Sequence, residues 1–89
     1  MFINKTSDGK NNLIGETLSA LRKNMHLSQR AFAEKLQIEG LEIDKNAIQR
    51  IECGKRFVTD IELVVICRVL QKTPNELLFT RSQDFSAFF

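Results

Sequence analysis

Helix-breaking and metal-binding residues are scarce in this sequence of 89 residues. It contains one proline, four glycines, two cysteines and one histidine. Because prolines and glycines are few, and β-branched residues never alternate over the length of a strand, we expect an all-α fold. Cys53 and Cys67 form no CxxC pair, and the whole sequence has only one histidine. Because these are too few ligands at the wrong spacing, we expect no zinc or other metal site. A disulfide between the two cysteines is the alternative to two free thiols, which suit a reducing compartment, and we expect a cytoplasmic protein.

Long apolar runs and a strong net charge are also missing. No run approaches the roughly 18 apolar residues that cross a bilayer, so no membrane span is expected. Residues 1–12 are polar and lack the apolar centre of a signal peptide. The formal net charge is only +2, so any contact with nucleic acid must come from local clustering of cations. No nucleophile–base set is visible, and we therefore expect neither enzymatic activity nor a cofactor.

Apolar residues recur at helical spacing in several segments, each preceded by a side chain that can cap a helix. The pattern predicts a single compact bundle. Thr59 with Glu62, and Thr73 with Glu76, have the spacing of a capping box. The expected helices are 13–25, 28–36, 44–53, 59–70 and 74–79. The expected caps are Asn11 or Asn12, Ser28, Asp44, Thr59 and Thr73.

Three segments of the chain are expected to contribute apolar side chains to the core. The first helix should bury Ile14, Leu18, Leu21 and Met25. The linker 37–43 bends at Gly40, and its apolar residues should lie beneath the bend. The helix 59–70 is apolar almost all round, so it should be central to the core or covered on one side by a partner. The linker residues expected to be buried are Ile38, Leu41 and Ile43.

The helix 44–53 has one apolar and one polar face. Ile48 and Ile51 should face the core, while the opposite face carries side chains that can bond phosphates and base edges. From residue 45 to 58 there are four cations and one acid. An α-helix fits the major groove of DNA, where Asn or Gln can bond adenine and Arg or Lys can bond guanine. The alternative is an ordinary solvated face. The polar residues are Lys45, Asn46, Gln49 and Arg50.

The two ends of the chain differ in composition from the centre. We expect residues 1–12 to form a flexible N-terminal arm and residues 13–80 to form the folded domain. Residues 81–89 end in three aromatic side chains that are hard to leave in water. These either fold back onto the domain or form a dimer contact. They are Phe85, Phe88 and Phe89.

Three runs together resemble the phage-repressor-type, Xre-like helix-turn-helix domain. They are LRKNMHLSQRAFAEKL, AIQRIECGKR and IELVVICRVLQKTPNELL, and the resemblance spans residues 14–78. It implies a five-helix bundle of the lambda-repressor-like DNA-binding type. The second and third helices of such a domain form the DNA-reading unit, which binds operator DNA, usually as a two-fold dimer, and represses transcription.

The resemblance also implies residue roles. It assigns base contacts to the four polar residues of helix 44–53, and phosphate contacts to Gln29, Lys55 and Arg56. Arg22 and Glu52 match an internal ion pair between the first and third helices. The chain departs from the family in a longer linker at 37–43, in Cys53 where a polar residue is usual, and in acids close to the reading face. Those acids are Glu39, Glu42 and Asp44.

The expected function is therefore that of a sequence-specific regulator, a repressor, that binds double-stranded DNA. We expect a homodimer formed through helix 59–70 and the aromatic tail. The alternative is a protein-interaction module or antitoxin-type adaptor that keeps the helix-turn-helix fold. The apolar helix 59–70 and the phenylalanine-rich tail favour that alternative.

Overall fold

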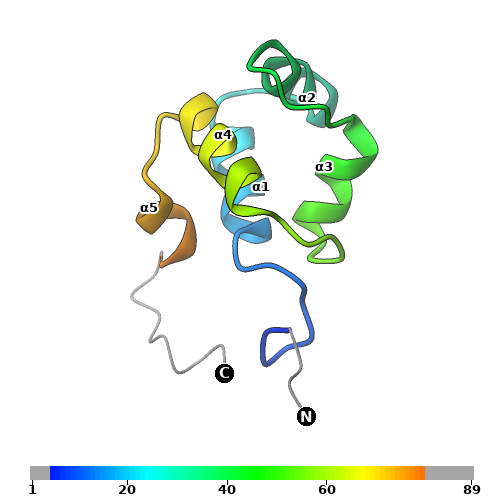
Figure 1. The fold of residues 1–89 in the computed structure, drawn as a ribbon, viewed down its shortest axis with the longest axis vertical. Coiled ribbons are helices and arrows are strands. Elements are labelled where there is room, and N and C mark those ends of the chain that lie inside the picture. The colour runs from blue at the N-terminus through cyan, green and yellow to red at the C-terminus, as the bar shows by residue number, and fades with distance from the viewer. Residues whose placement is uncertain (1–4, 80–89) are drawn as a thin grey trace.

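The computed structural model describes residues 5–79, and this part of the chain folds into five α-helices (Figure 1). Each predicted helix end lies within two residues of the observed one. The all-α, five-helix prediction is confirmed. The helices are α1 (Gly15–Asn24), α2 (Gln29–Ile38), α3 (Lys45–Glu52), α4 (Asp60–Leu70) and α5 (Pro74–Leu78).

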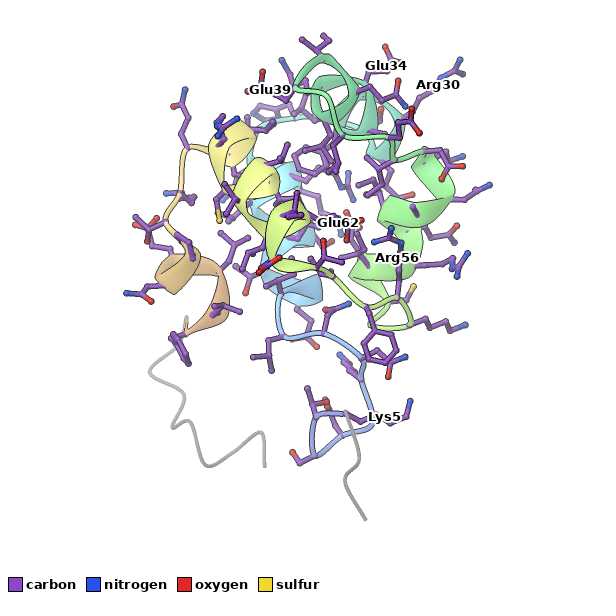
Figure 2. The ribbon with its side chains drawn as sticks, viewed as in Figure 1. Lys5, Arg30, Glu34, Glu39, Arg56 and Glu62 are labelled. Atoms are coloured by element: carbon purple, nitrogen blue, oxygen red, sulfur yellow. The ribbon has the colours of Figure 1, made fainter. Side chains whose placement is uncertain are left out.

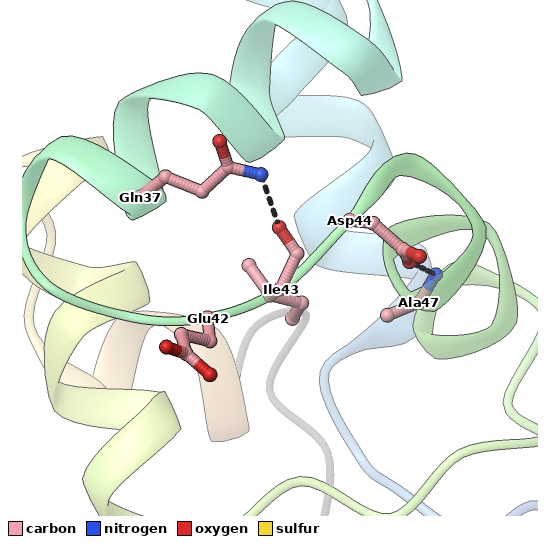
Figure 3. Close-up of a pocket in the computed structure, with 5 residues that line it drawn as sticks. All are labelled: Gln37, Glu42, Ile43, Asp44 and Ala47. Carbon is pink, nitrogen blue, oxygen red and sulfur yellow. Dashed lines mark hydrogen bonds between the residues drawn. The ribbon is translucent and has the colours of Figure 1, made fainter.

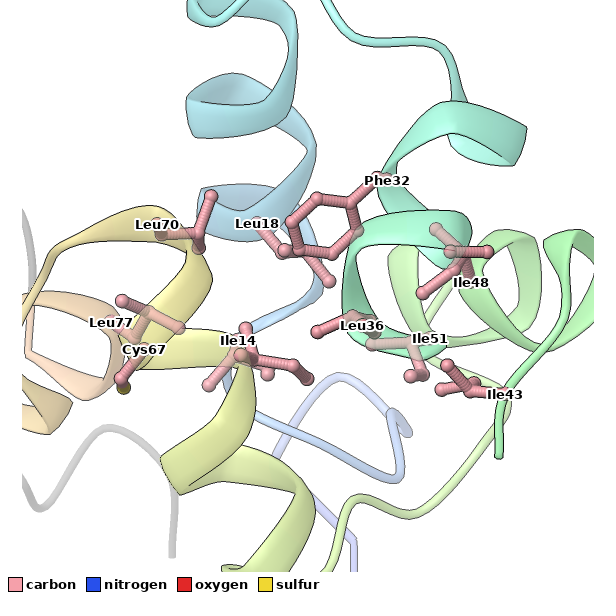
Figure 4. Close-up of a cluster of buried hydrophobic side chains, with 12 residues drawn as sticks. Ile14, Leu18, Phe32, Leu36, Ile43, Ile48, Ile51, Cys67, Leu70 and Leu77 are labelled. Carbon is pink, nitrogen blue, oxygen red and sulfur yellow. The ribbon is translucent and has the colours of Figure 1, made fainter. Parts of the chain in front are cut away.

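All five helices contribute to one apolar core. α3 packs against α1 and α2, and α4 packs against α2 and α5, so that α3 and α5 lie on opposite sides of the molecule (Figure 1). The aromatic ring of Phe32 is fully buried in the cluster drawn in Figure 4. The buried apolar residues are Ile14, Leu18, Phe32, Ala33, Leu36, Ile43, Ile48, Ile51, Ile66, Cys67, Leu70 and Leu77.

Side chains cap four of the helices as predicted. Ser28 and Asp44 accept hydrogen bonds from the first turns of α2 and α3. Thr59 and Thr73 each form a complete capping box with the glutamate three residues on. These caps satisfy backbone N–H groups that have no partner within the helix.

The prediction for the first cap needs correction. The N-cap position of α1 is Ile14, which makes no side-chain cap bond. The Asn12 side chain instead reaches forward and accepts from the Gly15 N–H at 2.9 Å. Asn11 does not cap the helix at all; its side-chain amide donates to the Lys55 carbonyl.

Two residues predicted to be buried are exposed. Met25 is 40% exposed, because α1 ends at Asn24 and the chain turns away there, with His26 in the left-handed region at φ 58°. Ile38 is 83% exposed. It lies two residues, about 200° around the helix, from the buried Leu36, so both cannot face the core.

The linker between α2 and α3 is shorter than the sequence suggested, because α2 continues to Ile38. Gly40 makes the bend at φ 93°. Leu41 is half-buried and Ile43 is buried beneath the bend, as predicted. The Gln37 side chain donates to the Ile43 carbonyl at 2.8 Å and so joins the end of α2 to the start of α3 (Figure 3).

α4 combines a buried and an exposed apolar face. Ile66, Cys67 and Leu70 belong to the core, and burial raises the pKa of the Cys67 thiol. Ile61 and Val64 are 71% and 50% exposed on the other face. α4 thus belongs to the core on one side and leaves an apolar surface on the other, and the covering of that surface by a partner stays a prediction.

The N-terminal segment is partly held against the domain. Residues 5–12 belong to the predicted arm, and among them Asn11 bonds the loop that follows α3. Residues 1–4 and the predicted tail, with Phe85, Phe88 and Phe89, lie outside the described residues. Within residues 5–79, no helix has the length and apolar character to cross a membrane, and no three potential metal ligands gather.

Candidate nucleic-acid interface

α3 presents a row of polar side chains to solvent. Asp44 begins the helix by accepting from the Ala47 N–H at 2.8 Å, and Gly54 ends it at φ 79°. Ile48 and Ile51 have no exposed surface, which fixes how the helix is rotated against the core. The four residues predicted from the sequence are all exposed on the outer side. They are Lys45, Asn46, Gln49 and Arg50.

A buried ion pair holds α3 against α1. Arg22 Nε lies 2.7 Å from Glu52 Oε2, and the two side chains are only 10% and 8% exposed. Arg22 Nη2 donates to Glu52 Oε1 at 3.1 Å, and Nη1 donates to the Leu27 carbonyl at 2.7 Å. The ion pair implied by the resemblance is therefore formed, with its charges matched by several hydrogen bonds, as burial requires.

Gln29 joins α2 to the same network. Its side-chain Nε2 donates to Glu52 Oε1 at 3.1 Å. One N–H of the amide is thus used within the domain, and the second is left for another acceptor. The contact of Gln29 with a DNA phosphate stays a prediction, but its amide is held in place beside α3.

The two cations of the loop after α3 behave differently. Lys55 is exposed, and its backbone N–H donates to the Arg50 carbonyl. Arg56 turns the other way and forms a two-pronged ion pair with Glu62 of α4, at 3.0 and 2.9 Å (Figure 2). The phosphate contact of Arg56 also stays a prediction, but its guanidinium already has a partner, whereas the Lys55 side chain points to solvent.

Acidic side chains do lie close to the predicted reading face. Lys45 and Asn46 line a hollow together with Glu34 and Asp44. A neighbouring hollow is lined by Gln37, Glu42, Ile43, Asp44 and Ala47 (Figure 3). Arg30 also lines the first hollow, so charges of both signs lie at this end of α3.

The Arg56–Glu62 pair predicts an acid-sensitive part of the stability. Hydrogen bonds from Arg56, and then from the backbone N–H of Thr59, lower the pKa of Glu62, and Glu62 raises that of Arg56. A carboxyl whose pKa is lower in the folded state stabilises the fold above its unfolded pKa and loses this effect as the pH falls through the folded value. Glu62→Gln should therefore be less stable than wild type near neutral pH, and the difference should vanish in acid.

Urea unfolding followed over a pH series measures this difference. Asp60→Asn, which removes an exposed carboxylate from the same helical turn, is the matched control and should not abolish the acid dependence. A stability gap between wild type and Glu62→Gln that stays constant with pH would contradict the role given to the ion pair.

The chain matches the helix-turn-helix family over residues 18–77, which is more than half its length, and it belongs to that family, with the Xre-type arrangement described above. A crystal structure of the P22 c2 repressor protein in complex with the synthetic operator 9T is similar to it. That structure shares 24% sequence identity, covers 81% of this chain and 98% of its own, and superposes with a TM-score of 0.65. The likeness shows the same lambda-repressor-like fold. The comparison with curated proteins found no match.

Proposed function

We propose that this protein is a sequence-specific DNA-binding regulator of transcription, a repressor that acts in the cytoplasm and reads the major groove with α3. The observation that carries the proposal is the outward row of Lys45, Asn46, Gln49 and Arg50 on a helix rotationally fixed by two buried isoleucines. Membership of the helix-turn-helix family supports it. So does the operator bound by the P22 c2 repressor, a protein of the same fold.

Each exposed side chain has a role set by its chemistry. Asn46 and Gln49 can each make two hydrogen bonds to adenine, and Lys45 and Arg50 can bond guanine. Gln29 and Lys55 contact phosphates, which set the register of the helix but carry no base sequence. Arg56 can contact a phosphate only if it leaves Glu62, so we assign it a smaller contribution to DNA affinity than Gln29 or Lys55.

We further propose that the protein binds as a homodimer. Ile61 and Val64 leave an apolar surface on α4, and Phe85, Phe88 and Phe89 supply apolar side chains in the tail. A two-fold dimer presents two copies of α3 to successive half-sites about one helical turn apart. The operator of such a dimer is an inverted repeat.

Selection of bound sequences from random duplexes, with the molar mass of the complex measured on the same sample, tests both proposals. We expect an enriched inverted repeat and the mass of two chains on one duplex. Absence of duplex binding at low salt would contradict the DNA-binding proposal. A single half-site with the mass of one chain would contradict only the dimer.

Lys55→Ala should weaken binding about equally for all sequences. Loss of one phosphate contact reduces the slope of log affinity against log salt by about 1. Affinities measured over a salt series give this slope. Lys72→Ala, at the exposed turn between α4 and α5, is the matched control and should leave the slope unchanged. Equal slopes for wild type and Lys55→Ala would remove Lys55 from the interface.

A protein-interaction module is the second candidate function. The exposed apolar side chains of Phe57, Ile61 and Val64 favour it, since they offer a surface on which another protein could pack. Co-purification of a partner at fixed ratio, together with no change in the mobility of duplex DNA, would decide for this function and against the first.

A further inference from the structure

Asn11 and Asn12 bond a series of backbone carbonyls at the end of α3 and in the loop after it. Asn11 donates its backbone N–H to the Gly54 carbonyl at 2.7 Å and its side-chain amide to the Lys55 carbonyl at 2.9 Å. The Asn12 side-chain amide donates to the carbonyls of Ile51 and Arg56, at 3.0 and 2.8 Å. We call these two residues the asparagine clamp.

The clamp donates to carbonyls that the regular helical repeat does not satisfy, those at the end of a helix and in a loop. Two adjacent amide side chains provide donors to both. The Ile51 carbonyl also accepts from the Gly54 N–H at 2.9 Å, so the clamp gives it a second donor. The acceptor oxygen of Asn12 also bonds the Gly15 N–H at 2.9 Å, so a single side chain joins the start of α1 to both ends of the loop.

The clamped loop is the one that carries Lys55. The Lys55 side chain is exposed, while its carbonyl is bonded by Asn11 and its N–H by the Arg50 carbonyl. Both backbone polar groups of Lys55 are thus engaged, and these bonds fix the point of the loop from which its side chain extends. Lys5 from the same N-terminal segment places its ammonium on the Asn11 side-chain oxygen at 2.8 Å, beside this loop (Figure 2).

We propose that Asn12, assisted by Asn11, is a positioning residue for nucleic-acid binding, which fixes the loop 53–56 so that Lys55 meets the phosphate backbone when α3 lies in the groove. The inference rests on the proposed function. It assigns to the segment 5–12 a part in the interface that lies outside the helix-turn-helix match at residues 18–77.

A merely structural role for the clamp predicts something different. Asn12→Ala would then lower the free energy of unfolding, and the protein that remains folded would bind DNA as wild type does. A positioning role predicts that folded Asn12→Ala binds about tenfold more weakly, the size of one lost hydrogen bond to a charged group. The salt slope should fall by about 1, as for Lys55→Ala.

The test compares Asn12→Ala, Lys55→Ala and the double variant with wild type, on the duplex selected by the wild-type chain. If the clamp acts through Lys55, Lys55→Ala should have a much smaller effect on affinity in the Asn12→Ala background than in wild type. Asn24→Ala, an exposed asparagine at the end of α1, is the matched control. Asn11→Ala loses the hydrogen bond to the Lys55 carbonyl but keeps Asn12. If Asn12→Ala does not fold, Asn11→Ala takes its place in the same comparison of affinities and salt slopes.

Folded clamp variants that keep both wild-type affinity and the wild-type salt slope would overturn this inference and leave the proposed function intact. Additive effects of Asn12→Ala and Lys55→Ala would also overturn it. No binding by the wild-type chain would overturn the proposed function, and the positioning role with it.

Discussion

Glu52→Ala is expected to lower the free energy of unfolding by about 3–5 kcal/mol, because it leaves the guanidinium of Arg22 buried without its counter-charge. Gln29 loses its acceptor in the same step, since its amide donates to Glu52 Oε1. A domain of this size has a total stability of about 5–15 kcal/mol. The variant should therefore lose a large fraction of its stability and unfold at a lower urea concentration and a lower temperature than wild type.

Two further variants show whether burial is the cause. Glu16→Ala removes the Lys10–Glu16 pair, whose side chains are 34% and 64% exposed, and should cost about 0–1 kcal/mol. Replacing both partners, as Arg22→Met with Glu52→Leu, should recover much of the stability, because no charge is then left unpaired. If Glu52→Ala cost no more than Glu16→Ala, the pair would not hold α3 in place.

Gly15→Ala is expected to destabilise the domain by about 1–3 kcal/mol through overpacking. A Cβ at this position would lie 2.5 Å from the Ile51 carbonyl oxygen and 3.0 Å from that of Glu52. Both are backbone atoms of α3, so the two helices would have to separate. Alanine is the better helix former by about 1 kcal/mol, so helix propensity alone would predict the opposite sign.

The sign of the change therefore decides between packing and propensity. Ala20→Gly at an exposed position of the same helix is the matched control, and should cost about 1 kcal/mol from propensity alone. Chemical unfolding of both variants gives the comparison. A stabilised Gly15→Ala would show that α1 and α3 do not meet as closely as the structure places them.

Features that depend on neighbouring residues in the chain could be predicted from the sequence. The caps at Ser28, Asp44, Thr59 and Thr73 were predicted because a cap and its acceptor sites lie within one helical turn. The outward face of α3 followed from the helical spacing of apolar residues. Local pattern was enough in both cases because the interactions themselves are local.

Features that join distant parts of the chain could not be predicted in this way. The sequence places Arg56 beside Lys55 in a cluster of cations, but in the structure Arg56 forms an ion pair with Glu62. The residues around Asn11 and Asn12 indicate only a polar arm or a helix cap, not bonds to the loop after α3. The close contact of Gly15 with α3 has no local sequence pattern that would predict it. The Arg22–Glu52 pair came from the resemblance alone, since the residues are far apart in sequence.

The α2–α3 linker shows a third limit. The sequence pattern predicts that α2 ends at residue 36 and that Ile38 lies beneath the bend. α2 instead continues to Ile38 and carries it to the solvent side. A change of two residues in a helix end moves a side chain to the opposite face, because each residue turns the helix by about 100°.

The most direct test of the account is the base preference of Gln49→Ala. Affinities for the selected duplex and for each of its single-base variants are measured with wild type, with Gln49→Ala and with Gln71→Ala as an exposed control far from α3 along the chain. If α3 reads bases, Gln49→Ala should lose about 1–3 kcal/mol of discrimination at one base pair of each half-site and keep the rest. An even loss at all positions, or an unchanged preference, would contradict the reading of bases by α3.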